Sequence, residues 1–206
     1  MDGVLVDSEE LMCKAAVLMF AEKGFRVKEK DFHPFRGMGE NRYLGGVAEK
    51  YDIPFDVEND KRRAYEIYGR IARSNLRPLP GVKEFIGKCR SKGLKIAVAT
   101  SADEIKMKIN LGEIGIPAET FDATVNGLEI EKKKPFPDIY LKAAERLNVE
   151  PECCLVVEDA ISGEKAAKSA GCRVLAITSS FSHEAFKYAD WKTSDLSAVP
   201  EECLTW

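Results

Sequence analysis

Residues 155–163 read Leu-Val-Val-Glu-Asp-Ala-Ile-Ser-Gly, and they indicate the fold class. The stretch begins with a short apolar run that is typical of a buried strand, and this run ends at Glu158 and Asp159. A helix is expected from Ser162 to Ala170, and a second strand from Arg173 to Ile177. Because a strand, a helix and a strand in this order form a parallel pair, the stretch predicts an α/β sheet.

The same alternation extends upstream to Pro78. The expected elements are helices at Gly81 to Lys92, Ala102 to Leu111 and Pro135 to Leu147, and strands at Leu94 to Ala99 and Phe121 to Val125. Pro135 stands in the first turn of its helix, where its missing N–H costs nothing. We therefore expect a doubly wound, parallel, Rossmann-like sheet, followed by a final strand and tail within Trp191 to Trp206.

The first third of the chain has helical spacing and no convincing strand. Ser8 is expected to cap a first helix, and Asp56 to Ser74 reads as a second, charged helix. The stretch between them is expected to be rich in turns because it holds four glycines: Gly37, Gly39, Gly45 and Gly46. The sequence thus predicts an all-helical cap, residues 9–78, inserted into an α/β core made of residues 1–8 and 79–206.

The composition excludes several classes of partner. With 31 basic and 34 acidic side chains among 206 residues, the chain has no field of one sign that would attract nucleic acid or an anionic membrane. It has no apolar run that could span a bilayer, and its start does not resemble a signal peptide. The six cysteines lack metal-binding spacing and are expected to be reduced thiols. We expect a cytoplasmic monomer or weak dimer.

Polar residues occur where the predicted strands end or the next helix begins. Asp2, Thr100, Lys134 and the pair Glu158-Asp159 should converge on one edge of the sheet, because ligands bind beyond the carboxyl ends of parallel strands. Each residue also has a structural interpretation. Asp2 with Gly3 could form a turn, Thr100 and Asp159 could cap helices, and two of the three lysines at 132–134 could be solvated.

In order and placement these residues resemble the haloacid dehalogenase superfamily, and within it the β-phosphoglucomutase-like phosphatases and phosphomutases with a helical cap. The segments that match the four family motifs are Asp2-Gly3-Val4-Leu5-Val6-Asp7-Ser8, Thr100-Ser101, Lys134-Pro135 and Glu158-Asp159-Ala160-Ile161-Ser162-Gly163. The resemblance covers essentially the whole chain, and it is the ordered set of motifs that makes it specific.

The resemblance implies catalytic roles for three side chains. Asp2 would be the general acid and base that protonates the leaving oxygen. Thr100, with the backbone amides of Ser101 and Ala102, would bind the transferring phosphoryl group. Lys134 would neutralise the charge shared by the nucleophile and the phosphate.

The resemblance also implies a magnesium ion. Asp159, supported by Glu158, and the backbone carbonyl of Asp2 would hold Mg²⁺, which prefers oxygen ligands. The substrate would be a small phosphorylated metabolite such as a sugar phosphate.

The first motif departs from the family pattern, which reads Asp-x-Asp-Gly after an apolar strand. Met1 occupies the x position, so the nucleophilic aspartate and the central strand before it are absent from these residues. We expect that the missing residues lie upstream and that these 206 residues alone do not form the aspartyl phosphate. If Met1 is instead the true start, the alternative is a noncatalytic sugar-phosphate binder.

The stretch from Pro34 to Glu40 matches the loop with which the family's caps select substrates. Arg36, Gly37 and Glu40 are therefore candidate substrate-binding residues, although Arg36 could equally be a solvated surface residue. Where β-phosphoglucomutases carry an arginine for a second phosphate, this sequence has Glu40. This difference favours a phosphatase over a mutase.

Overall fold

Five short parallel strands form the centre of the molecule in two separate groups. In the computed structural model, which describes residues 1–35 and 38–205, β1 (Ala97–Ala99) pairs with β2 (Ala123–Val125). In the second group, β4 (Arg173–Ile177) lies between β3 (Leu155–Glu158) and β5 (Trp191–Thr193). Every pair is parallel, which confirms the α/β class predicted from the alternation of elements.

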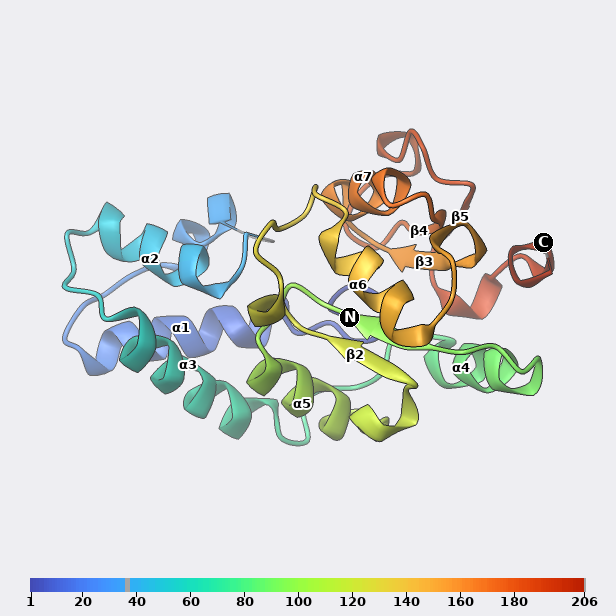
Figure 1. The fold of residues 1–206 in the computed structure, drawn as a ribbon. Coiled ribbons are helices and arrows are strands. Elements are labelled where there is room, and N and C mark those ends of the chain that lie inside the picture. The colour runs from blue at the N-terminus through green and yellow to red at the C-terminus, as the bar shows by residue number, and fades with distance from the viewer. Residues whose placement is uncertain (36–37, 206) are drawn as a thin grey trace.

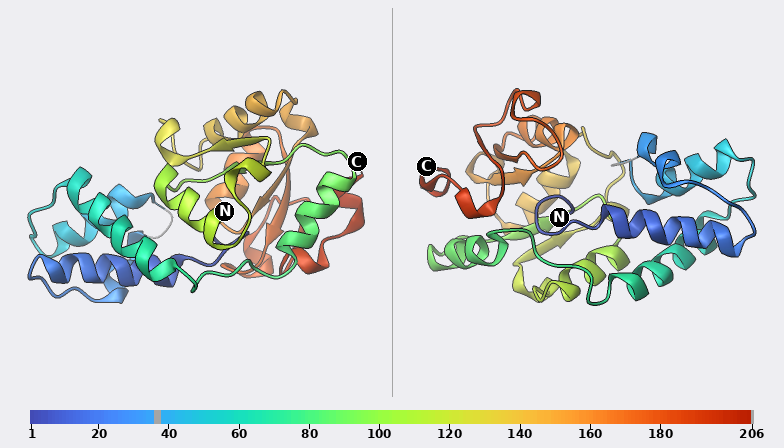
Figure 2. Two further views of the ribbon diagram at one scale, coloured as in Figure 1. Left: turned by 90° about the horizontal axis from the view of Figure 1, so that it is seen from below. Right: turned by 180° about the vertical axis from the view of Figure 1, so that it is seen from behind.

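Among the described residues no strand joins β1 to β3, and residues 1–6 contact both groups of strands. On one side, Met1 and Leu5 pack against the cluster that Val98 of β1 forms with Met107 and Leu111. On the other side, Gly3 lies directly against Asp159, which follows β3. Figure 2 shows the N-terminus within the α/β part of the molecule. The sheet is therefore open in its middle, where the sequence predicted that a central strand is missing.

The core helices cover both faces of the strands, as expected of a doubly wound sheet. The bounds of these helices are α4, Val82–Ser91; α5, Glu104–Glu113; α6, Asp138–Leu147; and α7, Ile161–Ser169. On one face, Ile139 of α6 and Ala166 of α7 join a buried cluster with Val125, Val156 and Val174 of the strands. Separate clusters hold the buried apolar residues of α4 and α5.

Three helices form the cap at the other end of the molecule (Figure 1): α1 (Glu9–Glu22), α2 (Glu40–Lys50) and α3 (Val57–Ala72). Phe20 of α1 and Tyr68 of α3 are fully buried, and burial of an aromatic side chain of this kind contributes about 2 kcal/mol. The bidentate ion pair of Arg63 with Glu22 joins the same two helices at the surface, where such pairs contribute about 1 kcal/mol or less.

The predicted start of the helix at Pro135 was wrong. Helix α6 begins at Asp138 with Pro137 at its N-cap, so Pro135 stands in a loop before the helix rather than in its first turn. Strand β1 is also shorter than predicted, since the Ile96 amide donates to the Asp122 carboxylate (2.7 Å) instead of continuing the ladder. In both cases the regular element is shorter, and the adjoining loop longer, than the apolar pattern predicted.

The predicted glycine-rich turn was wrong for two of its residues, because Gly45 and Gly46 lie inside α2. A Cβ atom on Gly46 would stand 2.4 Å from the ring of Phe35, so this glycine allows close packing rather than a turn. Ser8 is the N-cap of α1, as predicted, but its hydroxyl makes no capping bond and donates to Asp2 instead.

Two expectations drawn from composition can be compared with the structure. All six cysteines are free thiols. Within residues 1–35 and 38–205, we find no helix with the length and apolar character needed to cross a membrane.

A substitution at Gly81 tests the packing of the C-terminal segment on α4. Gly81 has φ +77°, and a Cβ atom there would lie 2.1 Å from the backbone nitrogen of Ser197. We expect Gly81→Ala to lower the free energy of unfolding by roughly 2–4 kcal/mol, measured by urea denaturation. Gly87→Ala is the control. Gly87 lies within α4 and a Cβ atom there would contact no other residue, so this substitution should stabilise the protein by about 0.5–1 kcal/mol. Equal stabilities of the two variants would show that Gly81 is not needed for this packing.

Candidate functional site

Asp2 is held on the side of the site that faces α5. Its Oδ1 accepts hydrogen bonds from the Ser8 hydroxyl and from Asn110 Nδ2 (2.9 Å), and its Oδ2 lies 3.6 Å from Lys106 Nζ. Burial alone would raise the pKa of Asp2, but the charge of Lys106 and the hydrogen bond from Ser8 hold it below its usual value. Asp2 is therefore an ionised, oriented carboxylate and not only part of a turn.

Glu158, at the end of β3, accepts four hydrogen bonds. Its Oε1 receives the Lys134 ammonium and the Tyr140 hydroxyl (2.7 Å), and its Oε2 receives the backbone amides of Asp159 and Ala160 (3.0 Å each). Although burial would raise the pKa of Glu158, Lys134 and the other donors lower it to about 2. Glu158 thus fixes Lys134 and the first turn of the loop that carries Asp159.

Asp159 lies over the backbone of the first motif. A Cβ atom on Gly3 would be 2.0 Å from Asp159 Oδ2, so only glycine, here with φ +70°, allows this approach. The Ser180 hydroxyl donates to the same oxygen (2.5 Å). Burial and the neighbouring charge of Glu158 raise the pKa of Asp159.

Contacts bring the predicted acids and the lysine together beside the first motif. Lys134 binds Glu158, and Glu158 accepts a hydrogen bond from the backbone amide of Asp159. Gly3, the neighbour of Asp2, lies directly against the Asp159 carboxylate. Lys134, Glu158 and Asp159 are therefore grouped beside the backbone of Asp2 and Gly3.

Thr100, Ser101 and Ala102 form the loop after β1. The Thr100 amide donates to Val125 of β2 (2.9 Å), and its Oγ1 accepts from the Ala102 amide (3.2 Å). This bond lies within the loop and does not cap α5, whose N-cap is Asp103, so the capping interpretation of Thr100 was wrong. A Cβ atom on Gly127 would stand 2.1 Å from the Ser101 carbonyl, so this loop packs directly on the loop that follows β2.

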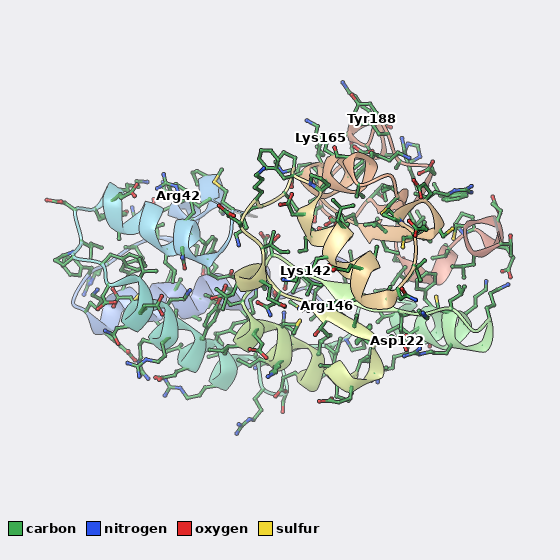
Figure 3. The ribbon with its side chains drawn as sticks, viewed as in Figure 1. Arg42, Asp122, Lys142, Arg146, Lys165 and Tyr188 are labelled. Carbon is green, nitrogen blue, oxygen red and sulfur yellow. The ribbon has the colours of Figure 1, made fainter. Side chains whose placement is uncertain are left out.

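The loop that carries Lys134 is held by basic side chains. Lys142 and Arg146, labelled on α6 in Figure 3, both bind Glu129, whose carboxylate in turn accepts from the Asn126 amide. Lys133 donates to the carbonyls of Gly127 and Ile130, so it is not merely solvated as the sequence suggested. Lys133 is thus bound within the loop, and Lys134 is the lysine that contacts Glu158.

The predicted substrate loop is only partly visible, since Arg36 and Gly37 lie outside the described residues. Glu40 is 8% exposed and begins α2, with its Oε1 3.4 Å from Lys106 Nζ. Sequence reasoning gave no role to Lys106, nor to Asn110 one turn later. The signal was present, because both residues share the buried face of α5 with Met107 and Leu111.

The donor set suits a hard cation at Asp159. The Asp159 carboxylate and the Ser180 hydroxyl are oxygen donors of the kind that Mg²⁺ binds while keeping several waters. Glu158 would serve as a support, since both of its oxygens already accept hydrogen bonds. Among the described residues, no three His, Cys, Asp or Glu side chains gather as a preformed metal cluster. The predicted magnesium ligands Asp2, Glu158 and Asp159 stay a prediction.

The interaction of Glu158 with Lys134 should make stability depend on pH. The folded-state pKa of about 2 lies below the unfolded value of about 4.3, so Glu158 stabilises the fold above that value and loses this contribution as pH falls toward 2. In metal-free protein, we expect the advantage of the natural chain over Glu158→Gln in free energy of unfolding to shrink from pH 5 to about pH 2. Urea denaturation across this range measures it, with exposed Glu131→Gln as the control. An advantage independent of pH would contradict the assignment.

Comparison with known proteins identifies the family. The model of the haloacid dehalogenase-like hydrolases matches residues 1–177. The chain is 37% identical over 171 residues to a phosphorylated carbohydrates phosphatase of Thermotoga maritima, covering 83% of this chain and 79% of that protein. It is 43% identical over 192 residues to the chloroplastic protein SUPPRESSOR OF QUENCHING 1 of Arabidopsis thaliana, covering 92% of this chain but 18% of that protein. The crystal structure of CbbY from Rhodobacter sphaeroides with phosphate superposes with a TM-score of 0.89 at 25% identity, covering 99% and 96% of the two chains. The chain belongs to the haloacid dehalogenase-like hydrolase family.

Proposed function

We propose that this chain carries the site of a Mg²⁺-dependent phosphatase of small phosphorylated metabolites, most specifically sugar phosphates. The observation that carries the proposal is the grouping of Lys134, Glu158 and Asp159 beside the backbone of Asp2 and Gly3. Two relatives support a phosphorylated substrate, since one is named for phosphorylated carbohydrates and the CbbY structure holds phosphate. The name of the first relative supports a sugar phosphate in particular. Proposed with it are the boundaries of the cap at residues 9–78 and of the core at residues 1–8 and 79–206.

In this proposal each side chain has one task. Lys134, held by Glu158, places a positive charge beside the entering phosphate. Asp2 is ionised in the substrate-free site, so it takes up a proton from solvent when the phosphate binds, delivers this proton to the leaving oxygen and later takes one from water. Bound at Asp159, Mg²⁺ would offset the negative charge of the phosphate, so that the anionic nucleophile could approach it. The nucleophile would be an aspartate placed directly before Met1, which is not among these residues.

A mutase is the second candidate, and Glu40 disfavours it. A mutase must bind a second phosphate under the cap, and the buried Glu40 carboxylate would repel that dianion. Lys106 is already shared between Glu40 and Asp2, so it offsets this repulsion only in part. A substrate with one phosphate and neutral hydroxyl groups therefore fits the described residues better than a bisphosphate.

The activity test compares two chains, the 206 residues alone and the same residues preceded by an apolar strand that ends in aspartate next to Met1. We expect the extended chain to release phosphate from a panel of sugar phosphates in Mg²⁺ and not in EDTA. Asp159→Asn should lower turnover by roughly 100-fold or more. The 206-residue chain should form no labelled phosphoenzyme. Stoichiometric labelling of that chain would identify a different nucleophile.

Magnesium binding provides a second measurement that does not depend on turnover. Calorimetric titration of the 206-residue chain with Mg²⁺ should show binding that Asp159→Asn removes. The control is Asp7→Asn, which changes an exposed carboxylate of the same motif. Unchanged binding in Asp159→Asn, or full activity of the extended chain in EDTA, would exclude the proposed metal site.

A further inference from the structure

One face of α5 meets the Asp2 carboxylate. Lys106 and Asn110 are four residues apart and so lie on the same side of this helix. Lys106 Nζ lies 3.6 Å from Asp2 Oδ2, and Asn110 Nδ2 donates to Asp2 Oδ1 at 2.9 Å. Lys106 is 6% exposed and Asn110 is fully buried. Each oxygen of Asp2 thus has its own partner on α5.

Each of these two partners also contacts a helix of the cap. Lys106 Nζ is 3.4 Å from Glu40 Oε1 at the start of α2, and the Tyr68 hydroxyl of α3 donates to Asn110 Oδ1 at 2.5 Å. Asp2 is therefore linked to α2 through Lys106 and to α3 through Asn110. The two links are separate, and each passes through one intermediate side chain.

The opposite charges of Lys106 and of the carboxyl groups of Asp2 and Glu40 stabilise one another. Burial alone would lower the pKa of Lys106, but Asp2 and Glu40 together raise it above its usual value. Without the ammonium, the buried Glu40 carboxyl group and the partly buried Asp2 carboxylate would lose the cation that they share, which is unfavourable. Glu40 and Lys106 therefore help Ser8 and Asn110 to hold the Asp2 side chain in its observed orientation.

We infer that Lys106 and Asn110 are positioning residues that orient the Asp2 carboxyl in response to the contacts made by cap helices α2 and α3. The catalytic consequence rests on the proposed function, in which Asp2 gives its proton to the leaving oxygen as the P–O bond breaks. The electron pair of that bond stays on the leaving oxygen, and the phosphoryl group passes to the nucleophile. Proton transfer requires the two oxygens within hydrogen-bond reach, so a misplaced Asp2 fails at this step.

The first experiment measures the orientation of Asp2 in the metal-free 206-residue chain. The carboxyl ¹³C resonance of Asp2, assigned by its loss in Asp2→Asn, is recorded at one neutral pH. Glu40→Gln and Tyr68→Phe change only cap residues. We expect each to displace or broaden the Asp2 resonance more than any other assigned carboxyl resonance outside the substituted residue.

Two control variants distinguish the links from a general loosening of the protein. Lys61→Met breaks a buried cap-to-core ion pair with Asp103 (2.9 Å) that does not include Asp2, and Lys108→Met changes an exposed lysine of α5. Both should leave the Asp2 resonance in place. An Asp2 resonance unmoved by Glu40→Gln and Tyr68→Phe, or moved equally by Lys61→Met, would overturn the inference.

The second experiment uses the extended chain and two classes of substrate. A sugar phosphate needs its leaving oxygen protonated, whereas p-nitrophenyl phosphate has a stable leaving anion. We expect Glu40→Gln and Lys106→Met to lower kcat for the sugar phosphate about tenfold or more, with about twofold change for the aryl ester, and Lys106→Arg to restore most of the loss. Equal losses for both substrates would show a merely structural role. If the extended chain has no phosphatase activity, the proposed function fails while the resonance measurements still decide whether the links exist.

Discussion

The buried carboxylate of Glu158 is the group on which the rest of the site depends. Its four donors come from three parts of the chain: the loop before α6, helix α6 itself and the backbone after β3. A buried charge is stable only when its hydrogen-bonding capacity is met, so the loss of one donor would leave the Glu158 carboxylate partly uncompensated. This requirement places Lys134 and Asp159 at fixed positions relative to one another, although 24 residues separate Lys134 from Glu158.

Close backbone approach is the second constraint, and it explains why residues 1–6 contact both groups of strands. Gly3 admits the Asp159 carboxylate at a distance that any Cβ would block, and its carbonyl accepts from Ser179 after β4. Met1 and Leu5 pack on the β1 side. Among the described residues, a turn thus lies between β1 and β3, and its backbone groups bond to one another, for example the Gly3 amide to the Val6 carbonyl (2.9 Å) and the Leu5 amide to the Met1 carbonyl (2.8 Å).

The sequence predicted the parts of the molecule that depend on local pattern. Apolar runs with short connections located β3, β4 and the helices around them, and acids directly after a strand located Glu158 and Asp159. It did not predict features created by tertiary contacts. Lys106 and Asn110 stand out in the sequence only as polar residues on an apolar helix face, and their cap partners Glu40 and Tyr68 follow only from the tertiary structure. Gly46 likewise looks like a turn residue until its packing against Phe35 is known.

The balance of charge connects the two halves of the site. Two buried carboxyl groups, Glu40 and Glu158, and two partly buried ones, Asp2 and Asp159, are countered among the named side chains by two ammonium groups, Lys106 and Lys134. Burial raises the pKa of Asp159, and it raises the pKa of Glu40 in spite of the nearby Lys106. For Asp2 and Glu158 the lysine and the hydrogen-bond donors outweigh burial, so their pKa values are lowered. An incoming phosphate would add further negative charge to this excess. A divalent cation at Asp159 would offset the charge of the carboxylates and that of the phosphate. The proposed magnesium ion and the phosphate should therefore bind more tightly together than separately.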